Sequence, residues 1–172
     1  APGRMERITS GRISDQNPTV FVDYAHTPDA LDNVASTIKE FKKKRQKLTV
    51  VFGCGGDRDR KKRPVMAQIS QKYADRIIVT SDNPRTENPD SIIDEIITGF
   101  SESAIYSRIV SRREAIEHSI KTAGKNDIIL IAGKGHETYQ EVNGVRSHFD
   151  DREIARDVLN FLETAKPTGE AG

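Results

Sequence analysis

The stretch Arg76-Ile77-Ile78-Val79-Thr80-Ser81-Asp82-Asn83-Pro84-Arg85-Thr86-Glu87 passes directly from an apolar run into a polar loop. Its first five residues are typical of a short buried strand. Pro84 fixes its own φ and disfavours helix at Asn83, so we expect the loop to be extended. Ligands of open α/β sheets bind outside the carboxyl ends of the strands, where this loop would present an acid, an amide and a guanidinium. The alternative is an ordinary strand–helix turn in which Asp82 and Asn83 cap the next helix.

Apolar runs and amphipathic segments alternate on both sides of this stretch. Thr27 and Pro28 mark one helix start, as N-cap and first helical residue. Asn143-Gly144 indicates a hairpin with a primed turn. The alternation predicts an α/β domain with right-handed βαβ units and a mostly parallel sheet covered by helices on both faces. We expect strands at residues 19–24, 48–52, 77–80, 107–110 and 127–132, a strand-like start before residue 9, a loop or short hairpin at 10–17, a β-hairpin at 139–149, and helices at 27–41, 65–73, 89–100, 115–123 and 151–162.

Length and composition limit the class of protein. A chain of 172 residues with 35% hydrophobic and 31% charged content is most simply one globular domain, and no apolar run approaches a membrane span. The net charge of +1 argues against nucleic-acid binding. The single cysteine, Cys54, excludes an internal disulfide, fits a cytoplasmic location and has no partner at zinc-ligand spacing. The start without methionine predicts a piece of a longer protein, with a domain at 1–165 and a disordered tail at 166–172.

The polar signals fall in four loops, each after the carboxyl end of an expected strand. The loops are residues 23–29, 53–60, 82–87 and 133–137. Parallel strands would place all four on the same side of the sheet, which predicts a binding site there. The glycines of residues 53–56 allow a ligand to approach the backbone, although a tight turn explains them nearly as well.

Neither glycine-rich loop completes a phosphate-binding motif. Arg58 stands where the dinucleotide fingerprint needs its third glycine. Gly135 stands where the P-loop needs Ser or Thr after its lysine. Asp23 is a candidate for a ribose hydroxyl or a metal-bound water, with helix capping as the alternative, and His26 is a candidate nucleotide contact. No nucleophile–base pair and no metal motif is evident, so we expect neither a dedicated catalytic residue nor a metal site in this chain.

Six motifs, taken in order, closely resemble the carboxy-terminal domain of the Mur ligase family, and the resemblance covers the chain from Pro2 to about Leu162. The motifs are residues 2–6, Asp23-Tyr24-Ala25-His26-Thr27-Pro28-Asp29, residues 52–59, Lys62-Arg63-Pro64, Asp82-Asn83-Pro84-Arg85 and residues 132–137. The resemblance implies a Rossmann-like third domain of an ATP-dependent ligase of peptidoglycan synthesis. The UDP-sugar-binding domain and the central ATPase domain would be absent from this chain.

The resemblance is to the members that add meso-diaminopimelate to UDP-N-acetylmuramoyl-L-alanyl-D-glutamate. It assigns binding of that amino acid to Arg58, Asp82, Asn83, Pro84, Arg85, Gly133 and Glu137. It assigns Arg4, Asp23 and His26 to the nucleotide side, with ATP and Mg²⁺ held mainly by the central domain. Diaminopimelate carries a second carboxylate that a guanidinium pairs with, whereas lysine would bring an ammonium against Arg85.

The family mechanism implied is phosphorylation of the substrate carboxylate by ATP, followed by attack of the amino acid's amine. The third domain would position the amine, so we expect the isolated chain to be folded, monomeric and catalytically inactive. Three alternatives stay open: a ligase that adds L-lysine, a stand-alone amino-acid-binding module, and a generic nucleotide-binding α/β protein. The last is disfavoured by the two failed fingerprints.

Overall fold

The computed structural model describes residues 3–10 and 16–165 of the chain. Most of the loop expected at residues 10–17 and the tail expected at 166–172 lie outside the described residues. The elements are β1 (Glu6–Ile8), β2 (Thr19–Asp23), α1 (Pro28–Phe41), β3 (Leu48–Phe52), α2 (Lys62–Tyr73), β4 (Arg76–Val79), α3 (Pro89–Ile97), β5 (Tyr106–Arg108), α4 (Arg112–Lys121), β6 (Ile128–Ala132), β7 (Tyr139–Val142), β8 (Val145–His148) and α5 (Asp151–Thr164).

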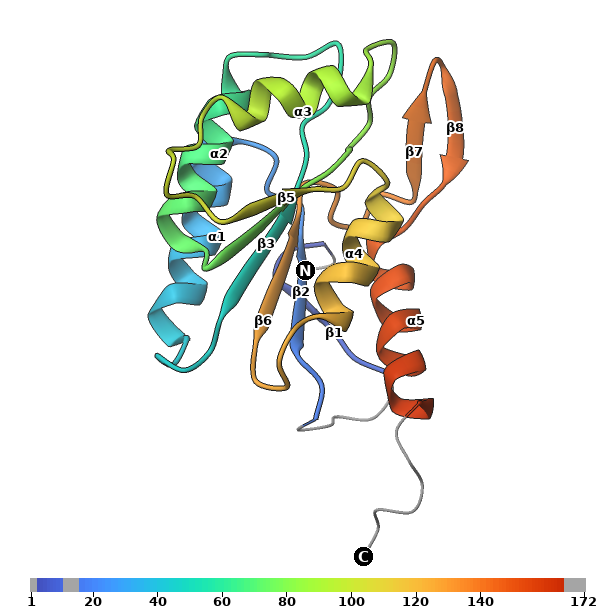
Figure 1. Cartoon of the computed structure of the whole chain (residues 1–172). Coiled ribbons are helices and arrows are strands. Elements are labelled where there is room, and N and C mark those ends of the chain that lie inside the picture. The colour runs from blue at the N-terminus through green and yellow to red at the C-terminus, as the bar shows by residue number, and fades with distance from the viewer. Residues whose placement is uncertain (1–2, 11–15, 166–172) are drawn as a thin grey trace, which may run out of the picture.

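The main sheet has six strands in the order β1-β2-β6-β3-β4-β5. Only β1 is antiparallel to its neighbour; the other pairs in this sheet are parallel. Strand β6 lies between β2 and β3. The chain therefore leaves β3 toward β4 on one side, and leaves β6 toward α5 on the other. This divergence creates a crevice above the carboxyl ends of β6 and β3, the usual ligand position in such sheets. The hairpin β7–β8 forms a separate two-stranded sheet that projects beyond this edge (Figure 1).

The sheet is the middle of three layers. Helices α1, α2 and α3 cover one face, and α4 and α5 cover the other (Figure 1). Successive residues of the central strands alternate between the two cores: Val50 packs in the first cluster and Val51 in the second. Strands β3 and β6 are buried along their whole length, as expected for parallel strands covered on both sides. The predicted α/β class, with helices on both faces and a carboxy-terminal hairpin, is confirmed.

The helix starts follow the capping signals. Thr27 caps α1 through a bond from Ala30 N to its side chain, and Pro28 is the first helical residue. Asn88 caps α3, so the alternative that Asp82 and Asn83 cap this helix is wrong. Asp150 caps α5. The hairpin turn is also confirmed, because Asn143 and Gly144 both have the positive φ of a primed turn, at 50° and 79°.

Several predicted boundaries are wrong. Helix α3 ends at Ile97 and not at residue 100, because the Thr98 hydroxyl bonds the Glu95 carbonyl and the chain turns at Gly99. Phe100 still packs on the core, so the apolar spacing continued past the helix end. Helix α4 likewise ends before Ala123, which packs on the second core from outside the helix. Strand β5 is Tyr106–Arg108 rather than residues 107–110, and β2, β4 and β6 each differ from the prediction by about one residue at an end.

Candidate functional site

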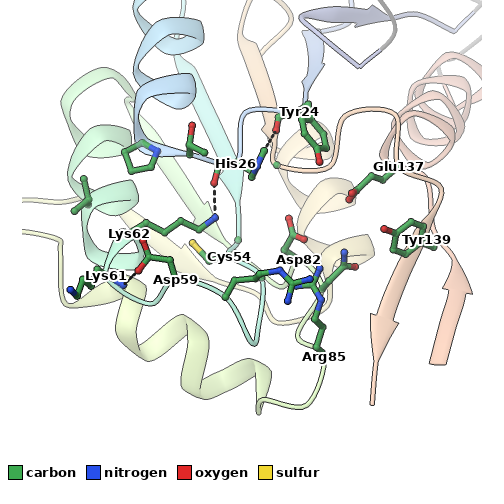
Figure 2. A pocket seen from close by; sticks show the side chains of 18 residues that line it. Tyr24, His26, Cys54, Asp59, Lys61, Lys62, Asp82, Arg85, Glu137 and Tyr139 are labelled. Atoms are coloured by element: carbon green, nitrogen blue, oxygen red, sulfur yellow. Dashed lines mark hydrogen bonds between the residues drawn. The ribbon is translucent and has the colours of Figure 1, made fainter. Parts of the chain in front are cut away.

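A cavity of about 760 Å³ lies above the carboxyl ends of the parallel strands (Figure 2). All four polar loops contribute to it, together with the first residue of the hairpin. The convergence predicted from the four loops is therefore confirmed. The lining residues are Tyr24, His26, Thr27, Pro28, Gly53, Cys54, Gly55, Arg58, Asp59, Lys61, Lys62, Val65, Asp82, Asn83, Arg85, Gly133, Glu137 and Tyr139.

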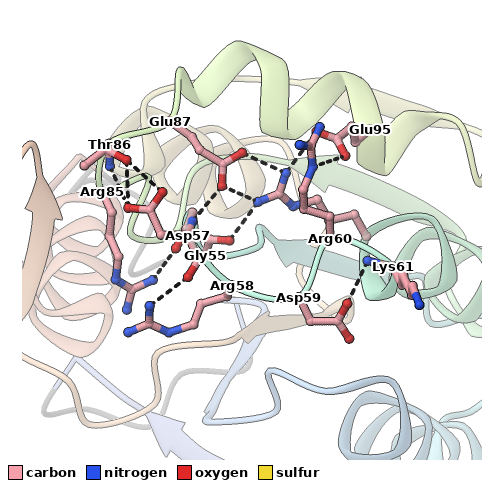
Figure 3. A network of polar contacts seen from close by, with 12 residues as sticks. Gly55, Asp57, Arg58, Asp59, Arg60, Lys61, Arg85, Thr86, Glu87 and Glu95 are labelled. Carbon is pink, nitrogen blue, oxygen red and sulfur yellow. Dashed lines mark hydrogen bonds and ion pairs between the residues drawn. The ribbon is translucent and has the colours of Figure 1, made fainter.

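The loop after β3 is fastened to the loop after β4. Gly56 N donates to the Asn83 carbonyl at 2.8 Å, and a Cβ on Gly56 would lie 1.9 Å from the Pro84 carbonyl oxygen. Only glycine permits this approach. Asp57, whose φ is 55°, accepts bonds from the backbone and hydroxyl of Thr86 (Figure 3). Pro84 does not line the cavity; its role in the structure is this backbone contact.

A buried guanidinium, that of Arg63, bonds to the loop after β3 and to the loop after β4. Arg63, in the first turn of α2, is fully buried and donates to the Gly55 carbonyl and to both carboxylate oxygens of Glu87. It also pairs with Glu95 at 3.0 Å. The hydrogen bond from Arg63 lowers the pKa of Glu87 to about 2. Glu87 therefore stays ionised and holds the loop after β4 against α2.

Arg85 is held by the hairpin. Its φ is 51°, in the left-handed region that is unusual for a non-glycine residue. Arg85 N donates to the Glu141 carbonyl at 3.0 Å, and Asn143 N donates to the Arg85 carbonyl at 2.8 Å. Its guanidinium donates to the Gly56 carbonyl at 2.9 Å and lies 4.0 Å from the Glu141 carboxylate. The hairpin thus fixes the backbone from which this side chain enters the cavity, a role that sequence reasoning missed.

Arg58 enters the same cavity from the loop after β3. Its Nη1 donates to the Asp57 carbonyl at 2.9 Å, and the side chain is exposed. A Cβ on Gly55 would be 2.8 Å from the Arg85 guanidinium and 3.8 Å from Cγ of Arg58, so both arginine side chains pass close to Gly55 (Figure 3). The two predicted arginines therefore form one cationic wall.

Carboxylates stand across the cavity from the arginines. Burial raises the pKa of Glu137, an effect that the nearby Lys134 ammonium opposes. Gly133 has a φ of 119°, and a Cβ there would lie 2.8 Å from an Asp82 carboxylate oxygen. The glycine lets Asp82 close over the end of β6. Arg85 and Glu137 lie on opposite sides of this pocket, with the Asp82 side chain between them (Figure 2).

Two buried cations of the site were missed by sequence reasoning. Lys134 is fully buried, and its Nζ donates to Asn83 Oδ1 at 2.7 Å. Arg112, 1% exposed, pairs with Asp151 at 2.7 Å and donates to the carbonyls of Ser81 and Ala132. It thereby ties the ends of β4 and β6 to α5. Lysine and arginine are rarely buried unless paired, and the partners Asn83 of Lys134 and Asp151 of Arg112 are distant in sequence, so no local pattern reveals the burial.

The predicted nucleotide-side residues gather at a second cavity of about 530 Å³, which is lined by Arg4, Asp23 and His26 among others. His26 and Tyr24 line both cavities. Both carboxylate oxygens of Asp23 accept backbone bonds, from Met5 N and Ala25 N at 2.7 Å. Asp23 therefore holds the segment next to Arg4 against β2, and the alternative that it caps α1 is wrong because Thr27 does so.

The remaining observations concern sulfur, metals and membranes. Cys54 is free and buried, and burial raises the pKa of its thiol to about 12, which leaves it protonated. Within residues 3–10 and 16–165, no group of three or more His, Cys, Asp and Glu side chains is arranged to hold a metal ion. Among the same residues, no helix has the length and apolar character needed to cross a membrane.

Curated relatives share about half of the sequence. A protein from Oceanobacillus iheyensis, named UDP-N-acetylmuramoyl-L-alanyl-D-glutamate–2,6-diaminopimelate ligase, is 51% identical over 158 residues, which are 91% of this chain and 31% of that protein. A protein of the same name from Syntrophomonas wolfei is 53% identical over 160 residues, which are 92% of this chain and 32% of that protein. The chain therefore spans about a third of the length of these relatives.

Solved structures agree with this relationship. A structure of a ligase of the same name superimposes with a TM-score of 0.85 at 46% identity, covering 95% of this chain and 32% of the other. UDP-N-acetylmuramate-alanine ligase from Thermotoga maritima has a TM-score of 0.62 at 19% identity over 96% of this chain and 31% of its own, which shows the fold alone. The family described as Mur ligase, glutamate ligase domain, matches residues 3–135. The chain belongs to the Mur ligase family.

Proposed function

We propose that this chain is the amino-acid-binding domain of a ligase that adds meso-diaminopimelate to UDP-N-acetylmuramoyl-L-alanyl-D-glutamate. One observation carries the proposal: Arg58 and Arg85 line the cavity together with two acids, Glu137 on the side opposite Arg85 and Asp82 between them. A diamino diacid brings carboxylates for the arginines and ammonium groups for the acids, which matches this set of charges. The relatives that share about half of the sequence carry the name of such a ligase.

The guanidinium of Arg85 supplies the selectivity in this proposal. Meso-diaminopimelate has a distal carboxylate, and a guanidinium binds a carboxylate through two parallel hydrogen bonds. L-Lysine lacks that carboxylate, so its terminal ammonium would face the Arg85 cation without a neutralising partner inside a partly enclosed cavity. The hairpin bonds hold the Arg85 backbone, and the Gly56 carbonyl accepts from its guanidinium. The pocket therefore favours the diacid over the monoacid.

The chain's part in the reaction is to hold the attacking amine. Glu137 and Asp82 would receive the ammonium groups of the amino acid. Arg4, which lines the second cavity, would meet the anionic phosphate chain of the nucleotide. When ATP is bound, it supplies the phosphoryl group that activates the carboxylate of the other substrate. The described residues offer no cluster of metal ligands, so we assign Mg²⁺ to another part of the ligase. A monomeric state and a cytoplasmic location stay predictions.

The first prediction is that replacing Arg85 changes substrate selectivity. In the full-length ligase, Arg85→Ala should raise KM for meso-diaminopimelate by about 30-fold or more, because a charged hydrogen-bonded pair is lost. KM for ATP should stay within about twofold. The ratio of kcat/KM for meso-diaminopimelate to that for L-lysine should fall, because the repulsion of lysine is removed.

Arg156→Ala provides the matched control, since Arg156 is exposed on α5 and lines neither cavity. This variant should leave KM for meso-diaminopimelate, KM for ATP and the ratio of the two kcat/KM values unchanged. A wild-type enzyme that prefers L-lysine would support the lysine-adding alternative. Tight binding of meso-diaminopimelate by the 172-residue chain, without any ligase partner, would support a stand-alone binding module.

A further inference from the structure

Lys134 lies two residues after the end of β6, and its ammonium contacts residues that line the amino-acid cavity. Its ammonium donates to Asn83 Oδ1 at 2.7 Å and to the Tyr139 carbonyl at 2.8 Å. The carboxylates of Glu137 and Asp82 are 3.6 Å and 3.9 Å away. Burial lowers the pKa of Lys134, and the Asp82 carboxylate opposes that shift. A buried ammonium with acceptors on three segments organises those segments relative to one another.

The Asn83 carboxamide can take only one orientation here. Its oxygen accepts from Lys134 Nζ and also from Glu141 N, at 3.0 Å. Both partners are donors only, so rotating the amide by half a turn would set its NH₂ group against an ammonium and a backbone N–H. The two bonds occupy the oxygen, and the Nδ2 end is left over for another contact. Asn83 lines the cavity although it is almost entirely buried.

We propose that Lys134 is a positioning residue for amino-acid recognition, which fixes the Asn83 carboxamide with its NH₂ group as the ligand-facing end. The inference rests on the proposed function of this cavity. An NH₂ group donates hydrogen bonds, so Asn83 receives a carboxylate oxygen and disfavours an ammonium. Asn83 and Arg85 then select the same ligand group, although one of them is neutral.

The same ammonium also positions Arg85 indirectly. Through the Tyr139 carbonyl, Lys134 holds the first residue of β7. Strand β7 carries Glu141, whose carbonyl accepts from Arg85 N and whose own N–H donates to Asn83. The positions of Asn83 and Arg85, the two side chains of this loop that would bind a carboxylate, therefore both depend on the buried ammonium of Lys134.

A double-mutant cycle in the full-length ligase tests this role. Lys134→Met should raise KM for meso-diaminopimelate by about tenfold or more, while kcat and KM for ATP change by less than about threefold. In an Asn83→Ala background, Lys134→Met should raise KM by less than about threefold, because only its indirect effect on Arg85 remains. Lys125→Met, at an exposed lysine before β6, is the matched control and should have no effect. Equal effects of Lys134→Met in both backgrounds would overturn the proposal.

Asn83→Asp provides a test that does not depend on the stability of the Lys134 variant. A carboxylate accepts both bonds that Asn83 Oδ1 accepts, so the fold should persist with an unchanged or higher Tm. The ligand-facing donor becomes an anion, and KM for meso-diaminopimelate should rise by about 30-fold or more. An unchanged KM would show that the NH₂ end does not face the ligand, which overturns the proposal.

Failure of the proposed function is recognised separately. A wild-type ligase that does not use meso-diaminopimelate would refute that function alone. The Lys134–Asn83 contact is then judged without ligand, by ¹H–¹⁵N NMR of the 172-residue chain. A slowly exchanging Lys134 ammonium signal that shifts in Asn83→Ala supports the positioning role. A rapidly exchanging signal, insensitive to Asn83, overturns it.

Discussion

At the scale of single residues, the site is organised by buried cations beneath its loops. Arg63, Arg112 and Lys134 are each at most 1% exposed, and each donates to at least one backbone carbonyl of a cavity loop or of a strand end. Loops that pack against one another at a sheet edge leave carbonyl groups without strand partners, and buried acceptors need donors. The cations supply those donors and carry positive charge under a cavity that would bind carboxylates.

The ionisation of Glu87 should make the stability of the fold depend on pH. Its pKa is lowered from 4.5 to about 2, first by the hydrogen bond from Arg63. A lowered carboxyl pKa contributes stability that is complete above about pH 4.5 and is lost as the pH falls toward about 2. The Glu87→Gln variant should lose about 2 kcal/mol of unfolding free energy at pH 7, because the buried Arg63 loses charged hydrogen bonds. The difference from wild type should shrink as the pH falls below 4.5.

Urea unfolding between pH 7 and pH 3 measures this difference. Glu102→Gln is the control, because Glu102 is exposed in the segment between α3 and β5, away from the cavity. Its stability should follow that of the wild type at every pH. A Glu87→Gln difference that stays constant across the range would contradict an ionised Glu87 as the cause.

At the scale of elements, the hairpin β7–β8 is the part whose role the sequence did not reveal. Its turn was predictable from Asn143-Gly144, because that pair suits two consecutive positive φ angles. The part of the protein against which the hairpin packs was not predictable from the sequence. The hairpin packs against a loop more than 50 residues earlier, and the bond from Glu141 N to Asn83 Oδ1 spans 58 positions. At its base, His148 contacts Glu153 of α5 at 2.7 Å, and this contact raises the pKa of His148.

Loosening the hairpin should therefore weaken the amino-acid site. Gly144 has a φ of 79°, and a Cβ there would meet nothing within 4 Å. Gly144→Ala should destabilise the hairpin through backbone strain alone, by about 1 to 2 kcal/mol. Because the hairpin fixes Arg85, KM for meso-diaminopimelate in the full-length ligase should rise by about fivefold, with KM for ATP unchanged.

Asn143→Gly is the matched control for this prediction, since glycine accepts the φ of 50° at that position. It should leave KM nearly unchanged. If both variants behave alike, or if Gly144→Ala changes the two KM values equally, the hairpin does not act through Arg85.

The contrast between predictable and unpredictable features has a physical cause. Strands, helices and caps are set by residues close in sequence, so the alternation of apolar runs predicted the layers and placed four loops at one edge. The placement of β6 between β2 and β3, and the antiparallel β1, depend on contacts across the sheet. Lys134 and Arg112 look like surface residues in the sequence, because Asn83 and Asp151, which accept their hydrogen bonds, are 51 and 39 positions away. The extra helical turn predicted after Ile97 shows that an apolar spacing marks burial more reliably than it marks helix.

At the scale of the whole molecule, both faces of the sheet have complete cores. One hydrophobic cluster lies beneath α1, α2 and α3, and the other beneath α4 and α5. A chain that buries both faces within itself has what it needs for cooperative folding. The site, in contrast, opens to solvent at the edge of the sheet, and the chain spans about a third of the relatives it matches.

The last prediction joins these two observations: the 172-residue chain alone should fold but should not form the amide bond. Its described residues hold no cluster of metal ligands, and its glycine-rich loops lack a complete P-loop motif. Urea unfolding should show a single transition, and incubation with ATP, meso-diaminopimelate and UDP-N-acetylmuramoyl-L-alanyl-D-glutamate should yield no tripeptide product above background. Adding the rest of the ligase as a separate chain should restore some turnover. An Arg85→Ala chain added in the same way should restore less, because the amine would be poorly held. Turnover by the isolated chain would contradict the division of labour proposed for this domain.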